Sequence, residues 1–228
     1  MNRKLIVFSF DDGTIYDFRL IEILRRHNLT ATFNLNSELK DYVWYNEGIA
    51  IKRFDLNQDK SLYDGFEVAS HSKKHMYLTD LDEETLIDEV EGDANNLSNI
   101  FGYQVTSFAV PFDSVSEKII QTIKKKTSIK AIRVPNYKED FSLPTDSFHI
   151  GVNVYSCEIK SLDSLFTRFE SFLSSDEPIS LLVIAGHSYD FEIFKRWEYF
   201  EKFCYAVSCE SKVEVITMRE LARKYLDQ

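Results

Sequence analysis

The chain has 228 residues, of which 44% are hydrophobic and 28% are charged. Such a chain is long enough to bury a sizeable core, and its composition argues against extensive disorder. Its 27 Lys and Arg residues against 37 Asp and Glu residues give a formal net charge of −10. That balance argues against nucleic-acid binding, which would need a basic face. With 7 Gly and 4 Pro, long linkers are not expected, so residues 1–228 are predicted to form a single domain.

No apolar stretch approaches the length of a transmembrane helix. The apolar run after the amino terminus is interrupted by Asp11 and Asp12, too early for the core of a signal peptide. If the sequence is the full natural product, we expect a cytoplasmic protein. The three cysteines, Cys157, Cys204 and Cys209, form no C-x-x-C pattern, and we expect reduced thiols that mostly serve packing.

Short apolar runs alternate with helical patterns along the chain. The expected strands cover residues 4–10, 31–35, 67–70, 107–110, 131–134, 150–155, 179–185 and 213–216. The expected helices cover residues 17–27, 81–101, 114–126, 162–173, 191–207 and 218–225. For the long acidic helix over residues 81–101, Thr79 and Asp80 are the expected cap and Gly102 the expected stop.

This alternation predicts βαβ units and a parallel sheet. Polar or unusual residues follow several of the expected strands, namely Asp11, Asp12, His71, Pro111 and His187. In a parallel barrel these positions meet at the carboxyl-terminal rim, where active sites are built. The sequence therefore predicts that residues from nearly the whole chain converge on one face.

Residues 40–66 fit the alternation poorly and are rich in aromatic side chains, including Trp44. We expect an excursion over the rim. Two interpretations remain open, because an aromatic lid suits stacking on sugars, whereas large aromatic side chains in loops also simply pack down.

Asp11 and Asp12 are adjacent at the end of a strand. Neighbouring residues there point in opposite directions, so one carboxylate can bind a cation while the other accepts a proton. The alternative is a plain turn, since Asp12 and Gly13 form a standard turn signal.

His71 and His75 are four residues apart, and on a helical turn both imidazoles would lie on one face within reach of one metal ion. Chance pairs with this spacing are common. A carboxylate from a neighbouring strand end would complete a three-ligand set that leaves a position open for water, as in catalytic zinc sites. Such donors suit one divalent ion, with zinc expected and cobalt, nickel or iron also compatible.

His187 follows the most apolar expected strand. An imidazole there is suited to act as a general acid, with Asp190 orienting it. The alternative interpretation is a helix start, with Ser188 or Asp190 as the cap.

Together these residues resemble the polysaccharide deacetylases of carbohydrate esterase family four, also called the NodB-homology domain. Residues 8–13 look like the family's T-F-D-D-G element, and residues 71–75 match its H-[S/T]-x-x-H element. Residues 108–112 look like the third element, and residues 181–190 like the closing L-x-x-x-x-H element. The resemblance extends from about residue 4 to about residue 219 and implies a distorted, incomplete (β/α) barrel of the seven-stranded type, an α/β fold.

The resemblance implies a metal-dependent hydrolase that removes an N-acetyl group from a sugar and releases acetate. It assigns the role of general base to Asp11 and that of general acid to His187, and it makes the backbone N–H of Phe112 an oxyanion donor. The implied metal ligands are Asp12, His71 and His75. We further expect Pro111, Trp44 and Tyr189 to contact the substrate.

The chain also departs from the family pattern. Ala109 and Val110 stand where many members carry an arginine that tethers the catalytic aspartate, and the fourth element, whose aspartate partners that arginine, is not recognisable. Losing both is consistent, since either alone would leave an uncompensated charge. We predict that Arg133, at the end of the next strand, tethers Asp11 instead.

An N-acetylated sugar, oligosaccharide or glycan precursor is the expected substrate, and a precursor of a surface polysaccharide suits a cytoplasmic enzyme better than mature cell wall. Two alternatives remain. The same metal site would also serve hydrolysis of a non-sugar C–N bond, such as a cyclic amide. A metal-bearing carbohydrate-binding or scaffold protein without activity is the other, although such a protein would not need Asp11 and His187.

Overall fold

The computed structural model describes residues 2–226, and its centre is a sheet of parallel strands. The strands follow the order β8-β7-β6-β5-β2-β1-β10-β9, and β11 also pairs with β1. These strands are β1 (Arg3–Asp11), β2 (Thr32–Leu35), β5 (Glu67–Ser70), β6 (Ser107–Ala109), β7 (Ala131–Tyr137), β8 (Ile150–Val152), β9 (Val154–Tyr155), β10 (Ile179–His187) and β11 (Val213–Val215).

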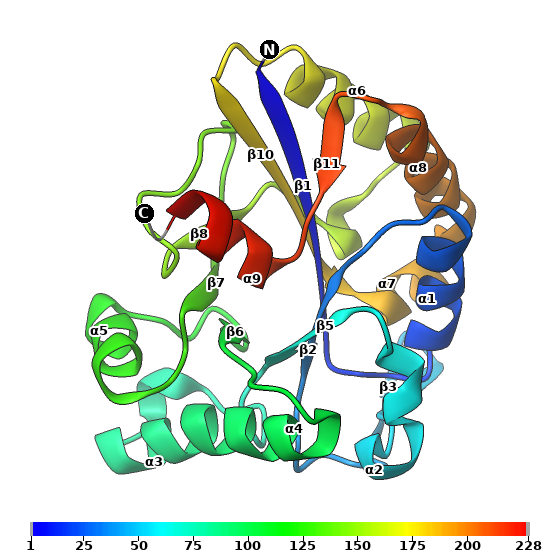
Figure 1. Cartoon of the computed structure of the whole chain (residues 1–228). Helices are drawn as coiled ribbons and strands as arrows, with labels where there is room; N and C mark the ends of the chain where they lie inside the picture. The colour runs from blue at the N-terminus through cyan, green and yellow to red at the C-terminus, as the bar shows by residue number, and fades with distance from the viewer. Residues whose placement is uncertain (1, 227–228) are drawn as a thin grey trace.

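Helices surround the strands (Figure 1). The longer ones are α1 (Asp17–Arg26), α4 (Asp93–Phe101), α5 (Glu117–Lys126), α6 (Leu162–Leu173) and α8 (Trp197–Cys209). The shorter ones are α2 (Leu56–Asp59), α3 (Glu83–Ile87), α7 (Ser188–Ile193) and α9 (Met218–Leu221). Across residues 2–226, no helix has the length and apolar character needed to cross a bilayer.

The sheet is nearly closed into a barrel, because β8 pairs with β7 and β9 pairs with β10. The junction is Asn153, whose N–H donates to the Val183 carbonyl at 2.9 Å and whose Oδ1 accepts from the Val183 N–H at 2.8 Å. This side chain takes over backbone pairing at the point where the strand predicted over residues 150–155 is interrupted. The distorted (β/α) barrel expected from the sequence is confirmed.

The side chains of β1 point alternately to its two sides and so contribute to two hydrophobic clusters, one toward the helices and one toward the barrel interior. Phe8 and Phe10 pack outward, and the Phe8 ring lies 5.8 Å from that of Phe200 on α8. Leu5 and Val7 belong to a second buried cluster that joins residues of β7, β8, β10 and α9. Because side chains alternate along a strand, Asp11 continues the inward series at the carboxyl end of β1.

Several predicted helix boundaries are wrong. A π-helical turn over Asp88–Gly92 interrupts the long helix between α3 and α4. The residue that caps the start of α3 is Asp82, whose side chain accepts from the Thr85 N–H at 2.8 Å. The expected cap residues, Thr79 and Asp80, lie in a separate turn over Leu78–Asp80. Gly102, with φ of +78°, ends the helix as expected.

The helix predicted over residues 191–207 is two helices, because Lys195 adopts a left-handed conformation with φ of +56° between α7 and α8. The residue that caps α7 is His187, so neither expected cap residue holds that place. A π-helical turn over Ala222–Leu226 also follows α9, where one closing helix was expected.

Residues 40–66 contain an antiparallel hairpin that the sequence did not predict, formed by β3 (Val43–Asn46) and β4 (Ile49–Lys52). The hairpin docks beside the end of β1, where the Phe54 N–H donates to the Gly13 carbonyl at 2.9 Å. The packing prediction for cysteine holds for buried Cys204 and is wrong for Cys157 and Cys209, which are exposed.

Candidate metal centre and catalytic site

Asp11 is the last residue of β1, and the strand register places it beside Asn34 on one side and His187 on the other. Its two carboxylate oxygens accept from different side chains. The Asn34 amide donates to Oδ1 at 2.7 Å, and Nη2 of Arg133 donates to Oδ2 at 2.6 Å. The predicted contact between Arg133 and Asp11 is therefore present.

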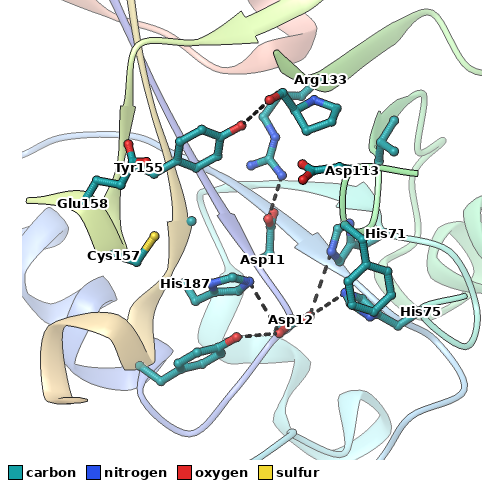
Figure 2. A pocket seen from close by; sticks show the side chains of 15 residues that line it. Asp11, Asp12, His71, His75, Asp113, Arg133, Tyr155, Cys157, Glu158 and His187 are labelled. Atoms are coloured by element: carbon teal, nitrogen blue, oxygen red, sulfur yellow. Dashed lines mark hydrogen bonds and ion pairs between the residues drawn. The ribbon is translucent and has the colours of Figure 1, made fainter. Parts of the chain in front are cut away.

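Asp12 has left the strand, with φ of +83°, and its carboxylate faces a different set of groups. Oδ1 accepts from Nη2 of Arg53 at 2.8 Å, and Oδ2 accepts from the Tyr189 hydroxyl at 3.2 Å. Oδ1 also lies 3.4 Å from Nε2 of His75 and 3.9 Å from Nε2 of His71. Figure 2 shows the two imidazoles on one side of Asp12 and His187 on the other.

His71 and His75 lie in the loop after β5 and not on the helical turn that was expected. Ser72 and His75 have φ of +63° and +54°, which a right-handed helix cannot contain. The imidazole rings still meet, with centroids 4.8 Å apart. The pair therefore converges through loop geometry and not through helical periodicity.

Asp12, His71 and His75 fit the requirements of a metal centre. Their ligand atoms all lie within 4.8 Å of one another, and ligands at zinc-bond length from a tetrahedral ion are about 3.3 Å apart. Nδ1 of His71 lies 2.8 Å from the Ala109 carbonyl. That hydrogen bond favours a proton on Nδ1 and directs the lone pair of Nε2 toward Asp12, the usual arrangement for a metal-binding imidazole.

The electrostatics separate the histidines into two kinds. Burial lowers the pKa of His71, and burial together with the charge of His71 lowers the pKa of His75 to about 3. Partial burial also disfavours the cation of His187, but Asp190 and Asp12 outweigh it and raise the pKa of His187 to about 9. At neutral pH two imidazoles are therefore free to coordinate a metal while the third carries a proton.

Both carboxylates are ionised at neutral pH. Burial alone would raise the pKa of Asp11, but the Arg133 guanidinium and the nearby imidazoles hold it below its usual value. Burial likewise opposes ionisation of Asp12, and Arg53 with the three imidazoles overcomes it, so its pKa is also lowered.

His187 is oriented from its own helix. Its Nδ1 lies 3.3 Å from Oδ2 of Asp190, and its ring stacks on that of Tyr189 with centroids 4.6 Å apart. Its Nε2 lies 3.8 Å from Oδ2 of Asp12. The Asp190 partner expected from the sequence is therefore present, and the same residue also completes the cap of α7.

An open cavity of about 570 Å³ lies over these groups, a size that suits a small-molecule or single-sugar site. Phe112 and Tyr189 line it, and Phe112 has φ of +54° and no hydrogen bond from its N–H within residues 2–226. Trp44 and Pro111 are not among its lining residues, and their contact with a substrate stays a prediction. The Trp44 ring instead lies 5.3 Å from the Arg53 guanidinium and 5.6 Å from the Tyr189 ring.

Sequence reasoning missed three buried polar residues around the carboxylates: Asn34, Asn36 and Arg53. Asn34 had a usable signal, because a polar residue inside an apolar strand next to β1 points to a polar partner. Arg53 comes from the unpredicted hairpin, and nothing in its local sequence indicates a contact with Asp12.

The fold and the site together define a parallel α/β barrel with a candidate metal centre at its carboxyl-terminal rim. A family model described as polysaccharide deacetylase matches residues 1–130. This match covers more than half of the chain, so the chain belongs to the polysaccharide deacetylase family.

A bifunctional xylanase/deacetylase of Pseudobutyrivibrio xylanivorans is 27% identical over 128 residues, which make up 54% of this chain and 19% of that protein. The chain therefore corresponds to a small part of that relative.

Solved structures share the fold at low sequence identity. The Xyl-CE4 domain of a multidomain xylanase from the hindgut metagenome of Trinervitermes trinervoides has a TM-score of 0.63 at 19% identity, covering 98% of this chain and 91% of that one. A family 4 acetyl xylan esterase from Clostridium thermocellum, in complex with a cobalt ion, has a TM-score of 0.59 at 15% identity and coverage of 96% and 90%. A CE4 family pseudoenzyme from Bacillus anthracis has a TM-score of 0.58 at 16% identity and coverage of 97% and 66%.

Proposed function

We propose that this protein is a metal-dependent N-deacetylase that releases acetate from an N-acetylated sugar or polysaccharide precursor. The observation that supports it best is the division of the site into two neutral imidazoles beside Asp12, a separate ionised carboxylate at Asp11, and a protonated imidazole at His187. Hydrolysis of an amide needs a base, an acid and charge stabilisation in one place, and these groups line one cavity.

Asp12, His71 and His75 would hold one divalent ion, for which zinc suits the donors best and cobalt, nickel or iron also fit. When bound, such an ion supplies Lewis-acid polarisation of an acyl carbonyl and makes water easier to deprotonate.

The chain's own residues supply the proton transfers. Asp11 accepts a proton from the attacking water, because it is ionised and lies on the cavity wall. Arg133 and Asn34 fix the direction of its oxygens. We assign the role of oxyanion donor to the Phe112 N–H and that of proton donor to the leaving nitrogen to His187.

A general acid at His187 suits an amide substrate, because an amine leaves an acyl carbon only after protonation. Asp190 and Asp12 raise the pKa of His187 to about 9 in the metal-free protein. Asp190, whose Oδ2 lies 3.3 Å from Nδ1 of His187, favours the proton also when a metal ion occupies Asp12. The mostly apolar and aromatic parts of the cavity wall, such as Phe112, Tyr155 and Tyr189, suit the faces of a sugar ring.

The test is acetate release from N-acetylglucosamine and its oligomers by zinc-loaded protein. We expect release that stops on addition of a chelator and in the Asp11→Asn variant. Acetylated xylan and a cyclic amide are the comparison substrates. Zinc binding without acetate release from any N-acetylated sugar would contradict the proposal, and release from acetylated xylan alone would contradict its N-acetyl part.

A further inference from the structure

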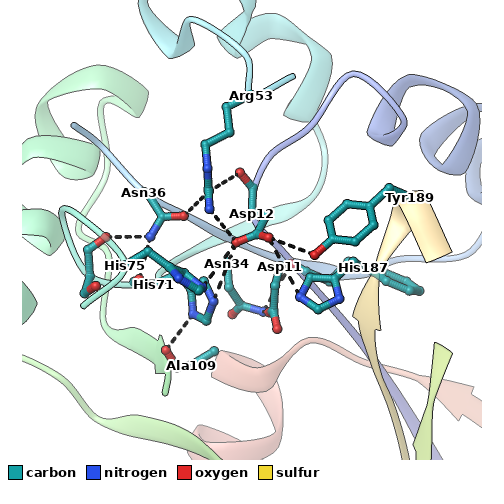
Figure 3. A network of polar contacts seen from close by, with 12 residues as sticks. Asp11, Asp12, Asn34, Asn36, Arg53, His71, His75, Ala109, His187 and Tyr189 are labelled. Carbon is teal, nitrogen blue, oxygen red and sulfur yellow. Dashed lines mark hydrogen bonds and ion pairs between the residues drawn. The ribbon is translucent and has the colours of Figure 1, made fainter. Parts of the chain in front are cut away.

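Arg53 and Asn36 connect the two loops that carry the candidate metal ligands (Figure 3). Nη2 of Arg53 donates to Oδ1 of Asp12 at 2.8 Å, and Nη1 donates to the Asp12 carbonyl at 2.7 Å. Nη1 also donates to Oδ1 of Asn36. The Asn36 amide in turn donates to the carbonyls of His71 and Ser72 at 2.6 and 2.7 Å.

We propose that Arg53 and Asn36 act as one positioning unit that sets the distance between Asp12 and the two histidines before a metal binds. This inference rests on the metal site of the proposed function and assigns roles to residues outside the ligand set. It also gives the hairpin of β3 and β4 a function, namely to deliver Arg53 to the site.

The ligand loops need such support because their backbones are unfavourable. Asp12, Ser72 and His75 are non-glycine residues with φ of +83°, +63° and +54°. The backbone of a non-glycine residue is strained in this left-handed region, and the conformation persists only where surrounding contacts hold it. Two of these three residues are held through their backbone carbonyls: Arg53 donates to that of Asp12, and Asn36 donates to that of Ser72.

Arg53 is itself held rigidly. It is 5% exposed and its guanidinium lies over the Trp44 ring. Its backbone N–H donates to the Tyr42 carbonyl at 2.9 Å, and it forms an isolated bridge with Thr14, two residues beyond Asp12. A cation fixed on two sides by the hairpin and the β1 loop can orient a carboxylate in a way that a mobile surface lysine cannot.

The guanidinium leaves coordination by Asp12 possible. A carboxylate oxygen has two lone pairs, so Oδ1 can accept from Arg53 and still face the imidazoles. The positive charge by itself opposes cation binding, whereas the orientation favours it. Arg53→Lys keeps the charge and loses the paired contacts of Nη1 and Nη2 with Asp12, which separates the two effects.

The experiment measures zinc affinity by competition with a chromophoric chelator for Arg53→Lys, Asn36→Ala and the double variant. We expect each single change to weaken zinc binding about 10- to 100-fold, the range typical of groups that orient metal ligands. If the pair works as one unit, the double variant loses less than the product of the single losses. Lys52→Ala is the control, because Lys52 is the exposed neighbour that pairs with Asp41.

A second readout separates positioning from general stability. The cobalt-loaded protein should show a changed visible absorption spectrum in both variants, because the ligand geometry differs, while circular dichroism of the metal-free forms stays native. Folded variants that keep wild-type zinc affinity and the wild-type cobalt spectrum would overturn the inference. If Arg53→Lys does not fold, Asn36→Ala decides, since it leaves the contact between Arg53 and Asp12 in place.

The same titration distinguishes this inference from the proposed function. A wild-type protein that binds no zinc contradicts the metal site itself. Wild-type binding combined with unchanged binding in the two folded variants contradicts only the role of Arg53 and Asn36.

Discussion

Asp11 and Asp12 are neighbours in the sequence, but their carboxylates belong to different regions of the site. Asp11 ends a strand, and its partners Arg133 and Asn34 come from neighbouring strands of the same sheet. Asp12 lies in a loop, and its partners come from the hairpin, the loop after β5 and the start of α7.

The comparison shows how one step along the backbone gives two identical side chains separate chemistry. Asp11 keeps the inward direction of β1, whereas the left-handed conformation of Asp12 turns the chain out of the strand. Each carboxylate therefore meets its own arginine and its own neutral partners. Arg133 lowers the pKa of Asp11, as the proposed base requires, and Asp12 lies beside two imidazoles whose pKa values are lowered, as the proposed metal site requires.

The largest expected effect is on the Asp12 region. His75→Ala removes one of the three proposed ligands, and we expect zinc affinity to fall on the order of a thousandfold, with loss of activity, because two protein ligands hold zinc poorly. Isothermal titration with zinc measures it. His149→Ala, remote from the cavity, is the control, and stoichiometric binding at wild-type affinity in His75→Ala would remove this residue from the ligand set.

In the Asp11 region we expect turnover to fall while zinc affinity is nearly kept. Asp11→Asn should lower the turnover number by about 10²- to 10⁴-fold, because the base is lost, while zinc affinity changes only a few-fold. Parallel measurements of acetate release and zinc binding test this. A large loss of zinc affinity would show that the two carboxylates share the metal and that their separation into two roles is wrong.

A smaller effect is expected when Arg133 is replaced. Arg133→Ala removes the cation that lowers the pKa of Asp11, so that pKa should rise and the acidic limb of the pH–rate profile should move to higher pH. We expect turnover near neutral pH to fall about tenfold. Lys130→Ala, an exposed change next to β7, is the matched control. An unchanged profile with unchanged turnover would show that Arg133 does not tune the base.

Asp17 is a third buried carboxylate, and it differs from Asp11 and Asp12 because, within residues 2–226, hydroxyl groups and no arginine donate to it. Burial raises the pKa of Asp17 to about 7, although Ser188 and Tyr63 donate to it. A raised carboxyl pKa means that the folded state favours the proton. The contribution of Asp17 to stability is therefore greatest below about pH 4 and falls as pH rises to about 7.

Asp17→Asn should remove this loss, which is at most about 4 kcal/mol because one pKa unit corresponds to about 1.4 kcal/mol. Chemical unfolding of metal-free protein between pH 4 and pH 8 measures it, with Asp163→Asn at an exposed position as control. If wild type and Asp17→Asn lose stability equally over this range, Asp17 does not titrate there.

Local patterns were sufficient for much of the fold. Residues 67–70 and 162–173 were predicted with the bounds that the structure has, because period-two and period-3.6 patterns depend only on nearby residues. The same alternation placed Asp11, His71 and His187 after parallel strands and so at one rim. The contact of Arg133 with Asp11 was also predicted from strand positions, although β7 continues past Arg133 to Tyr137 and did not end where expected.

The loops around the metal site could not be obtained in this way. The spacing of His71 and His75 indicated a helical turn, but left-handed conformations at Ser72 and His75 override it. The Ser72 carbonyl accepts from Asn36, which comes from the end of another strand. Arg53 reaches Asp12 across 41 residues of chain, and its position depends on how the hairpin docks.

The sequence by itself determined the alternation of parallel strands with helices and the types of groups that follow the strands, because periodicity depends on nearby residues. The barrel was expected from the resemblance to a known family. The tertiary structure alone decided which neighbour each carboxylate receives. That choice depends on hydrogen bonds between segments distant in the chain, formed only after the hairpin and the ligand loops have packed against the end of β1.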